Sequence, residues 1–150
     1  MKALEKAIKL LAIKYYSASE LQQKLRQKGF SDEEIKDAIK RLERYGYLDD
    51  EKFAQNFVES KIKQKPIGKK LVKQKLKQKK IPDKIIEKAV SAIKEEELIE
   101  VALEKRLQQK GCPKNQKEVK NLYNYLLRRG FSGDIIMEML RKADIFKLTD

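Results

Sequence analysis

Few residues in this 150-residue chain have side chains suited to catalysis. The sequence has no histidine, the residue that most often acts as a general base or activates a nucleophile. Its one cysteine, Cys112, lies in a Lys-Gly-Cys-Pro segment without a histidine partner, so we interpret it as a loop thiol. Neither GxxxxGK[ST] nor GxGxxG is present to cradle a nucleotide. We predict no catalytic residue, no metal site and no cofactor.

Two acidic runs could in principle hold a cation, but their positions favour a structural role. Asp49-Asp50-Glu51 and Glu95-Glu96-Glu97 each stand just before an apolar helical pattern. Acidic side chains at that point accept hydrogen bonds from the free N–H groups of a first helical turn. We predict that both runs cap helices.

Lysines are the residues with the clearest binding chemistry. Lys and Arg total 36 against 23 Asp and Glu, so the net charge is +13, which favours polyanionic partners. The charge is +4 over residues 1–48, +8 over 49–94 and +1 over 95–150. Between Lys61 and Lys80 stand ten lysines and no acid. The basic middle of the chain is therefore the candidate binding region.

A helix over residues 68–80 would gather lysines on one face. Its spacing puts Lys69, Lys73, Lys77 and Lys80 together, with Lys70 beside them. Like charges at that spacing cost a few tenths of a kcal/mol per pair, which a polyanion or an acidic protein surface would relieve. The alternative is a merely solvated face. Because lysine is a point charge, the face favours phosphate or carboxylate over base-specific readout.

An apolar frame recurs three times along the chain. Phe30, Ile81 and Phe131 are separated by 51 and 50 residues. Positions nine and five before each anchor, and five, nine and twelve after it, are apolar every time. These positions are Leu21, Val72 and Leu122; Leu25, Leu76 and Leu126; Ile35, Ile86 and Ile136; Ile39, Val90 and Leu140; and Leu42, Ile93 and Ala143. Such self-similarity indicates tandem repeats.

Each recurrence reads as two helices that meet at a turn, preceded by a further apolar-periodic stretch. The preceding stretches are residues 3–15, 50–64 and about 96–110. We predict an all-α fold of three tandem three-helix repeats of about 50 residues, forming an elongated, curved body. The predicted domains are 1–48, 49–95, which is the most basic, and 96–150.

Helix ends carry their own signals. Ser17 with Glu20 and Ser31 with Glu34 fit capping boxes, and Asn115 with Glu118 is a looser version. Gly29 and Gly130 are suited to the left-handed backbone conformation that often follows a helix, and Lys80 takes that place in the second repeat. Pro82 is suited to the start of a helix.

The tyrosines could stack on nucleic-acid bases, but their places near repeat ends favour packing. We predict that most are core or half-buried residues and assign them no site; they are Tyr15, Tyr16, Tyr45, Tyr47, Tyr123 and Tyr125. The first residues contain neither a signal-peptide core nor an apolar run that could span a bilayer. We therefore expect a soluble cytoplasmic protein, and nothing demands more than a monomer.

Several motifs resemble the RecX family of bacterial recombination regulators. The residues that carry the resemblance are Ser19-Glu20-Leu21, Lys28-Gly29-Phe30, Tyr45-Gly46-Tyr47-Leu48-Asp49-Asp50, Phe53-Ala54, Pro66-Ile67-Gly68-Lys69-Lys70-Leu71 and Gly130-Phe131-Ser132. Lys80 departs from the family, which often has glycine there, and many lysines stand where the family has arginines.

The resemblance implies a regulator of the RecA recombinase. Such a protein binds the RecA filament on single-stranded DNA, in the filament groove or at its growing end. It lowers ATP hydrolysis, strand exchange and co-protease activity. We expect Lys69, Lys70, Lys73, Lys77 and Lys80 to make electrostatic contacts, with Arg128 and Arg129 secondary, and we assign the segment from Gly46 to Asp50 to a turn and cap between repeats.

Two alternatives use the same features. Residues 19–44 alone read as helix, glycine turn and helix, as in a helix-turn-helix DNA binder. A nonspecific nucleic-acid-binding repeat would also be basic, and its binding would depend steeply on salt. An effect on the RecA recombinase itself would distinguish a RecX-like regulator from both of these DNA-binding alternatives.

Overall fold

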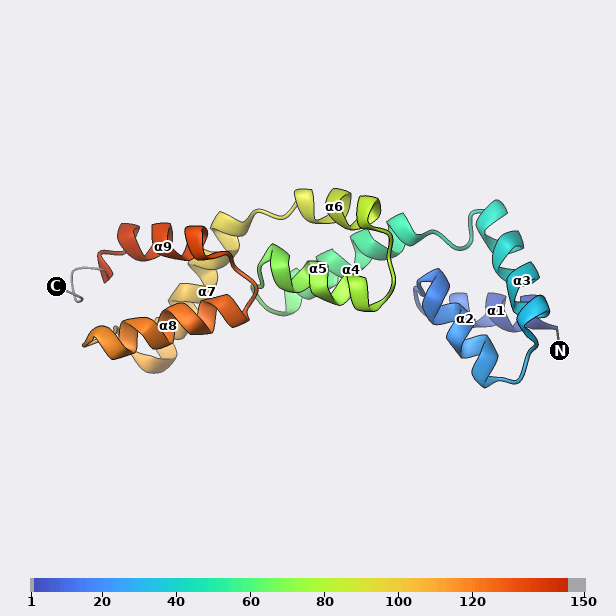
Figure 1. Ribbon diagram of the computed structural model, residues 1–150, viewed down its shortest axis with the longest axis horizontal. Helices are drawn as coiled ribbons and strands as arrows, with labels where there is room; N and C mark the ends of the chain where they lie inside the picture. Colours follow the sequence, from blue (N-terminus) through green and yellow to red (C-terminus); the bar gives the residue numbers. More distant parts are fainter. Residues whose placement is uncertain (1, 146–150) are drawn as a thin grey trace. The chain divides into compact units, whose positions relative to one another are not determined.

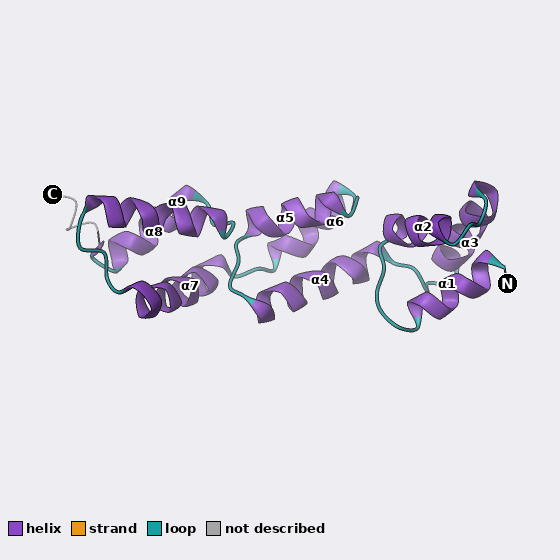
Figure 2. Ribbon diagram, turned by 90° about the horizontal axis from the view of Figure 1, so that it is seen from below, coloured by secondary structure: helices purple, strands orange, loops and turns teal. Residues whose placement is uncertain are grey.

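The structure is a computed structural model that describes residues 2–145. These residues form helices and loops and no strand (Figures 1 and 2). The helices are α1 (Ala3–Leu11), α2 (Ala18–Gln27), α3 (Asp32–Arg44), α4 (Asp50–Gln64), α5 (Lys69–Gln78), α6 (Asp83–Ser91), α7 (Glu95–Lys110), α8 (Gln116–Arg128) and α9 (Gly133–Lys142). The all-α prediction of three helices per repeat is confirmed. Residue 1 of the first predicted repeat and residues 146–150 of the third lie outside the described residues.

The described chain divides into two compact units. Unit 1 comprises the described residues up to Phe57 together with Leu76–Ala89. Unit 2 comprises Val58–Lys75 and the described residues from Val90 onward. The division passes through α4, α5 and the end of α6, so the second predicted repeat contributes to both units.

Each unit contains a three-helix bundle with its own apolar core. In unit 1, α1, α2 and α3 pack on one another around a core that includes Leu21, Leu25 and Leu42. In unit 2, α7, α8 and α9 pack around a core that includes Leu126, Phe131 and Ile136 (Figure 1).

The recurring apolar frame corresponds to the buried residues. All its positions are buried except Phe30, which is half-buried, and Ala143, which is exposed. Ala143 is the C-cap of α9, so no later turn of that helix covers it. The frame therefore also predicts the buried positions of the middle repeat, where Val72 and Leu76 are fully buried.

The predicted helix ends are largely confirmed. Both serines, Ser17 and Ser31, make reciprocal capping boxes with the glutamate three residues later. Asn115 accepts a hydrogen bond from the N–H of Glu118 at 2.9 Å, but the Glu118 carboxylate takes the N–H of Lys114 instead of closing a box. Gly29 and Gly130 have φ of +92° and +94°, and α6 begins directly after Pro82.

The first helix is shorter than predicted. The apolar pattern suggested residues 3–15, whereas α1 ends at Leu11 and the side chain of Ile13 is 82% exposed. After the turn that follows, Ser17 caps α2 with a fully buried side chain. No helix within residues 2–145 is long and apolar enough to cross a membrane.

Candidate functional site

Most of the predicted lysine face lies on α5. Lys69, Lys73 and Lys77 follow one another at four-residue spacing along this helix, and Lys70 is beside them. The side chains of Lys70 and Lys77 are exposed, and those of Lys69 and Lys73 are half-buried. The first turn of α5 contains no acidic residue of its own.

Lys80 does not share that helical face, which corrects the prediction. The helix ends at Gln78, and Lys80 follows it in the left-handed region with φ of +59°. Gly29 and Gly130 take the same place after α2 and α8. Lys80 is exposed, but it belongs to the turn that ends α5.

The first turn of α5 lies against the end of α8 in unit 2. The backbone N–H of Gly68 donates to the carbonyl of Arg129 at 2.8 Å, and that of Lys70 donates to the carbonyl of Gly130 at 3.1 Å. The fold thereby brings the predicted lysines at the start of α5 close to Arg128 and Arg129, about 60 residues later in the chain. We call Lys69, Lys70, Lys73 and Arg128 the basic cluster.

Two glycines make this close approach possible. A Cβ on Gly68 would overlap the carbonyl of Gly130 and would lie 2.6 Å from the nitrogen of Phe131. A Cβ on Gly130 would overlap the Cβ of Leu71. Larger residues would separate the two helix ends.

The N–H groups at the start of α5 are already bonded to protein. Besides the bonds to Arg129 and Gly130, the N–H of Lys69 donates to Oε2 of Glu95 at 3.2 Å. Glu95 is the first residue of α7. Through this hydrogen bond it caps the start of another helix, α5. A phosphate at this cluster would therefore be bound by side chains and not by the helix terminus.

Arg128 and Arg129, at the end of α8, are in different environments. The Arg129 guanidinium lies 5.5 Å from the centre of the Tyr125 ring, and its Nε donates to the Tyr125 hydroxyl at 3.3 Å. Arg106 covers the same ring at 4.2 Å. Arg128 is exposed. Arg128 is thus the better placed of the two for contact with a polyanion.

A junction of similar design lies in unit 1, where α2 begins. The buried Ser17 hydroxyl accepts the N–H of Glu20 at 3.1 Å and donates to the carbonyl of Lys79 at 3.3 Å. The N–H of Ala18 donates to Oδ1 of Asp50, the first residue of α4, at 3.0 Å. Asp50 therefore corresponds to Glu95 in unit 2.

Lys79 is a structural lysine in this junction. Its Nζ lies 2.7 Å from Oε2 of Glu20 and within 6 Å of the ring centres of Phe53 and Phe57, at 5.8 Å and 5.7 Å. Burial raises the pKa of Glu20, but hydrogen bonds from Lys79 and the Ser17 N–H, with the charges of Lys79 and Lys14, outweigh burial and lower it.

The capping prediction holds for Asp49 but is wrong for the second run, because no side chain caps α7 and Glu95 caps α5 instead. Asp49 accepts the N–H groups of Glu51 and Lys52, at 2.9 Å and 3.4 Å, at the start of its own helix. Asp50 and Glu95 instead cap α2 and α5. The sequence pattern located these carboxylates but could not identify the recipient helices, which are distant in sequence.

The expectation that most tyrosines are core or half-buried is wrong. Tyr16 is buried and Tyr123 and Tyr125 are half-buried, as expected. Tyr15, Tyr45 and Tyr47 are exposed, and the last two form a tilted ring pair with centroids 6.5 Å apart. These two flank the turn at Gly46, where φ is +78°, and their side chains are 67% and 68% exposed.

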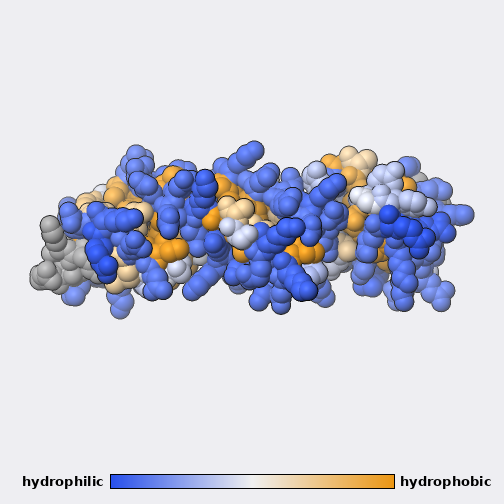
Figure 3. Space-filling view, turned by 90° about the horizontal axis from the view of Figure 1, so that it is seen from above, coloured by the Kyte–Doolittle hydropathy of each residue, from blue (hydrophilic) through white to orange (hydrophobic). Residues whose placement is uncertain are grey.

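Metal-ligating side chains form no site among the described residues. Within residues 2–145 no group of three or more His, Cys, Asp or Glu side chains could hold a metal ion, and Cys112 is an exposed free thiol. Hydrophilic residues cover most of the face in Figure 3, with apolar patches between them. The chemistry that the described residues present is mainly charge.

Family models match almost the whole chain. The first three-helix domain of RecX matches residues 3–42, the second matches 49–90 and the third matches 94–140. The solved structure of RecX from Lactobacillus salivarius has a TM-score of 0.85 and 23% identity, and the match covers 95% of each chain. This likeness supports the tandem three-helix fold.

Curated relatives carry the name regulatory protein RecX. The one from Chlorobaculum tepidum is 37% identical over 139 residues, covering 93% of this chain and 86% of the relative. The one from Prosthecochloris aestuarii is 36% identical over 140 residues, covering 93% and 91%. Because the matches extend through all three three-helix domains, this chain belongs to the RecX family of regulatory proteins.

Proposed function

We propose that this protein binds the RecA recombinase filament on single-stranded DNA and inhibits its ATPase, strand-exchange and co-protease activities. Membership of the RecX regulatory family supports this proposal. The structural observation that carries it is the basic surface along α5, which the fold extends to Arg128 at the end of α8. It acts without catalysis, as a cytoplasmic monomer, either in the groove of the filament or at its growing end.

The basic surface suits a filament better than a specific DNA sequence. The contacts that we propose come from Lys69, Lys70, Lys73, Lys77 and Lys80, with Arg128 and Arg129 secondary. Lysine ammonium groups attract both DNA phosphates and protein carboxylates without reading bases. A filament of protein on DNA presents both anions together, so this surface can contact both.

Charge reversal on the exposed lysines tests the proposal. Lys70→Glu/Lys77→Glu should weaken binding to RecA filaments on single-stranded DNA about tenfold or more, because each reversal replaces an attraction by a repulsion. The control Lys36→Glu/Lys40→Glu makes the same charge change at exposed positions of α3 and should weaken binding much less. Fluorescence anisotropy at fixed salt measures both. Equal loss in the two variants would show that only net charge matters.

Nonspecific binding to single-stranded DNA is a second candidate. The exposed pair Tyr45 and Tyr47 favours it, because exposed rings can stack on unpaired bases. Under this alternative, bare DNA would bind as tightly as the filament, and binding would fall steeply with added salt. Tighter binding to the filament than to bare DNA at the same salt concentration favours the regulator.

A further inference from the structure

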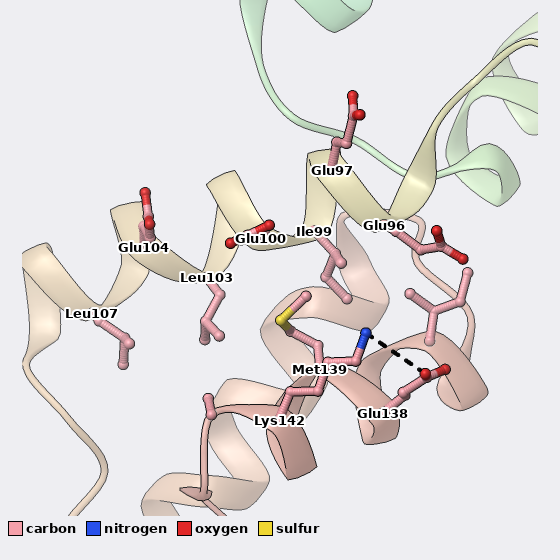
Figure 4. A pocket seen from close by; sticks show the side chains of 12 residues that line it. Glu96, Glu97, Ile99, Glu100, Leu103, Glu104, Leu107, Glu138, Met139 and Lys142 are labelled. Atoms are coloured by element: carbon pink, nitrogen blue, oxygen red, sulfur yellow. Dashed lines mark ion pairs between the residues drawn. The ribbon is translucent and has the colours of Figure 1, made fainter.

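Unit 2 has an apolar groove between α7 and α9 that is separate from the basic cluster. Its volume is about 540 Å³. Ile99, Leu103 and Leu107 point from α7 toward the side of α9 (Figure 4). Ile99 and Leu103 are buried and form the groove floor, and the half-buried Leu107, Ile135 and Met139 line it. Leu107, Ile135 and Met139 are therefore the apolar side chains that a ligand in the groove could contact.

Glutamates border this apolar surface. The glutamates that line the groove are Glu96, Glu97, Glu100 and Glu104 on α7 and Glu138 on α9. Lys142 is the one cation among the described lining residues, and its Nζ lies 3.8 Å from Oε1 of Glu138 (Figure 4). In a chain with a net charge of +13, this groove is locally acidic.

The spacing along α7 gives two parallel rows. Ile99, Leu103 and Leu107 follow one another at intervals of four residues, and so do Glu96, Glu100 and Glu104. The rows are offset by three residues, so they are adjacent on the helix surface. The exposed glutamate row spans eight residues, about 12 Å, or roughly two turns of a helix that packs alongside.

We propose that this groove binds a basic amphipathic helix of a partner protein. Leucines on one face of such a helix would pack on Leu107, Ile135 and Met139, and lysines or arginines beside them would pair with the glutamates. Like charges four residues apart repel along α7, and a cationic partner would relieve this repulsion. The inference does not depend on the proposed function of the basic cluster.

A second copy of this chain does not fit the groove as well. Its most basic helix, α5, has its apolar residues Val72 and Leu76 fully buried. Through α5, a folded copy could therefore offer lysines to the glutamates but neither of these two apolar side chains to the groove. A helix with an uncovered apolar face satisfies both requirements.

A synthetic peptide can test this proposal on the full-length protein. The probe is an amphipathic helix of about four turns with leucines along one face and lysines on the other. The controls are a peptide of the same composition with shuffled order and one with glutamate in place of lysine. Binding measured by fluorescence anisotropy should occur with the first peptide only, even though the net charge of the protein repels it.

Variants of the groove should change this affinity selectively. Glu100→Lys/Glu104→Lys alters two exposed rim positions and should weaken binding about tenfold or more. Glu5→Lys/Glu43→Lys makes the same charge change at exposed positions of α1 and α3 and should leave the affinity within about twofold. Circular dichroism should show equal helicity and melting for both variants, so that a loss of binding reports the groove.

Other results would overturn the assignment. Equal affinity of the two double variants, or equal binding of the shuffled peptide, would rule out the groove as a helix site. Binding only to a variant that ends at Ile145 would mean that the chain's own last residues occupy the groove. Self-association that Glu100→Lys/Glu104→Lys abolishes would assign the groove to a second copy. In NMR spectra, the methyl signals of Leu107 and Met139 should shift on peptide addition, and shifts confined to α1–α3 would contradict the proposal.

Discussion

At the scale of single residues, Ser17 satisfies three groups at once. Its hydroxyl accepts the N–H of Glu20 and donates to the carbonyl of Lys79, and its own N–H donates to the Glu20 carboxylate. A buried hydroxyl without such partners would cost stability. Ser17 therefore caps α2 and joins it to the turn that ends α5.

The lowered pKa of Glu20 predicts a pH dependence of stability. Because the carboxylate form is favoured in the folded state, its contribution is fully present at neutral pH and is lost as the pH falls through the folded pKa. Glu20→Gln should therefore unfold about 1 kcal/mol more easily at pH 7, and this difference should shrink in acid. Urea unfolding at several pH values measures it.

The exposed Glu43 provides a control for this prediction. Glu43→Gln should have little effect on stability at either pH. A deficit of Glu20→Gln that stays constant from pH 7 into acid would contradict the proposed role of the carboxylate charge.

Lys80 predicts a gain in stability from glycine. Its φ of +59° costs energy for a residue with a Cβ, whereas glycine adopts this region freely. Lys80→Gly should stabilise the protein by about 0.5 to 1 kcal/mol in thermal or urea unfolding. Lys80→Ala removes the same charge but keeps the Cβ, so an equal gain from alanine would mean that charge and not the backbone is responsible.

At the scale of helices, hydrogen bonds between helix ends link each repeat to the next. Backbone N–H groups at the start of α5 donate to carbonyls at the end of α8. At the start of α2, the Ser17 hydroxyl donates to the carbonyl of Lys79, just after α5. The positive end of one helix thus meets the negative end of another, which is favourable for both dipoles. Asp50 and Glu95 add a carboxylate at each of these starts.

Two glycines with the same backbone conformation test the packing at such a junction. Gly130 and Gly29 have nearly equal φ, but a Cβ on Gly130 would overlap Leu71 whereas Gly29 has open space. Gly29→Ala should cost about 1 kcal/mol, and Gly130→Ala about 2 to 4 kcal/mol because it also separates α5 from α8. Chemical unfolding of both variants measures the difference. Equal losses would show that the crossing contributes nothing.

Local sequence signals predicted the helices well because these signals act within one or two turns. The capping boxes of Ser17 and Ser31, the glycines after helices and the apolar frame all have short-range causes. The end of α1 was missed because Ile13 continues the apolar pattern although its side chain is exposed. Tyr45 and Tyr47 were expected to be buried or half-buried but are exposed, because the type of a side chain does not determine its burial at a turn.

At the scale of the whole molecule, the sequence located the basic region but not its neighbours. The acid-free lysine run is visible in the residue order, and so is its assignment to a helix. The approach of the end of α8 to the start of α5 is not visible there, because it depends on the crossing at Gly68 and Gly130. Long-range contacts of this kind also explain why Lys79, in the middle of the run, belongs to a structural ion pair.

The division of charge gives the chain two kinds of surface. The lysines of α5 favour polyanions, and the glutamates along α7 favour a cationic helix. The two proposals therefore make opposite demands on a ligand. Charge reversal at Lys70 and Lys77 should leave peptide binding at the groove intact, and reversal at Glu100 and Glu104 should not weaken filament binding.

The most direct test of the central claim is the steady-state ATPase of RecA on single-stranded DNA while this protein is titrated in near physiological salt. We predict inhibition that Lys70→Glu/Lys77→Glu reduces and Lys36→Glu/Lys40→Glu preserves. Inhibition well below one chain per recombinase subunit would favour end capping, because covering sites one by one needs stoichiometric amounts. An unchanged ATPase, while the protein still binds DNA in the same buffer, would contradict the claim.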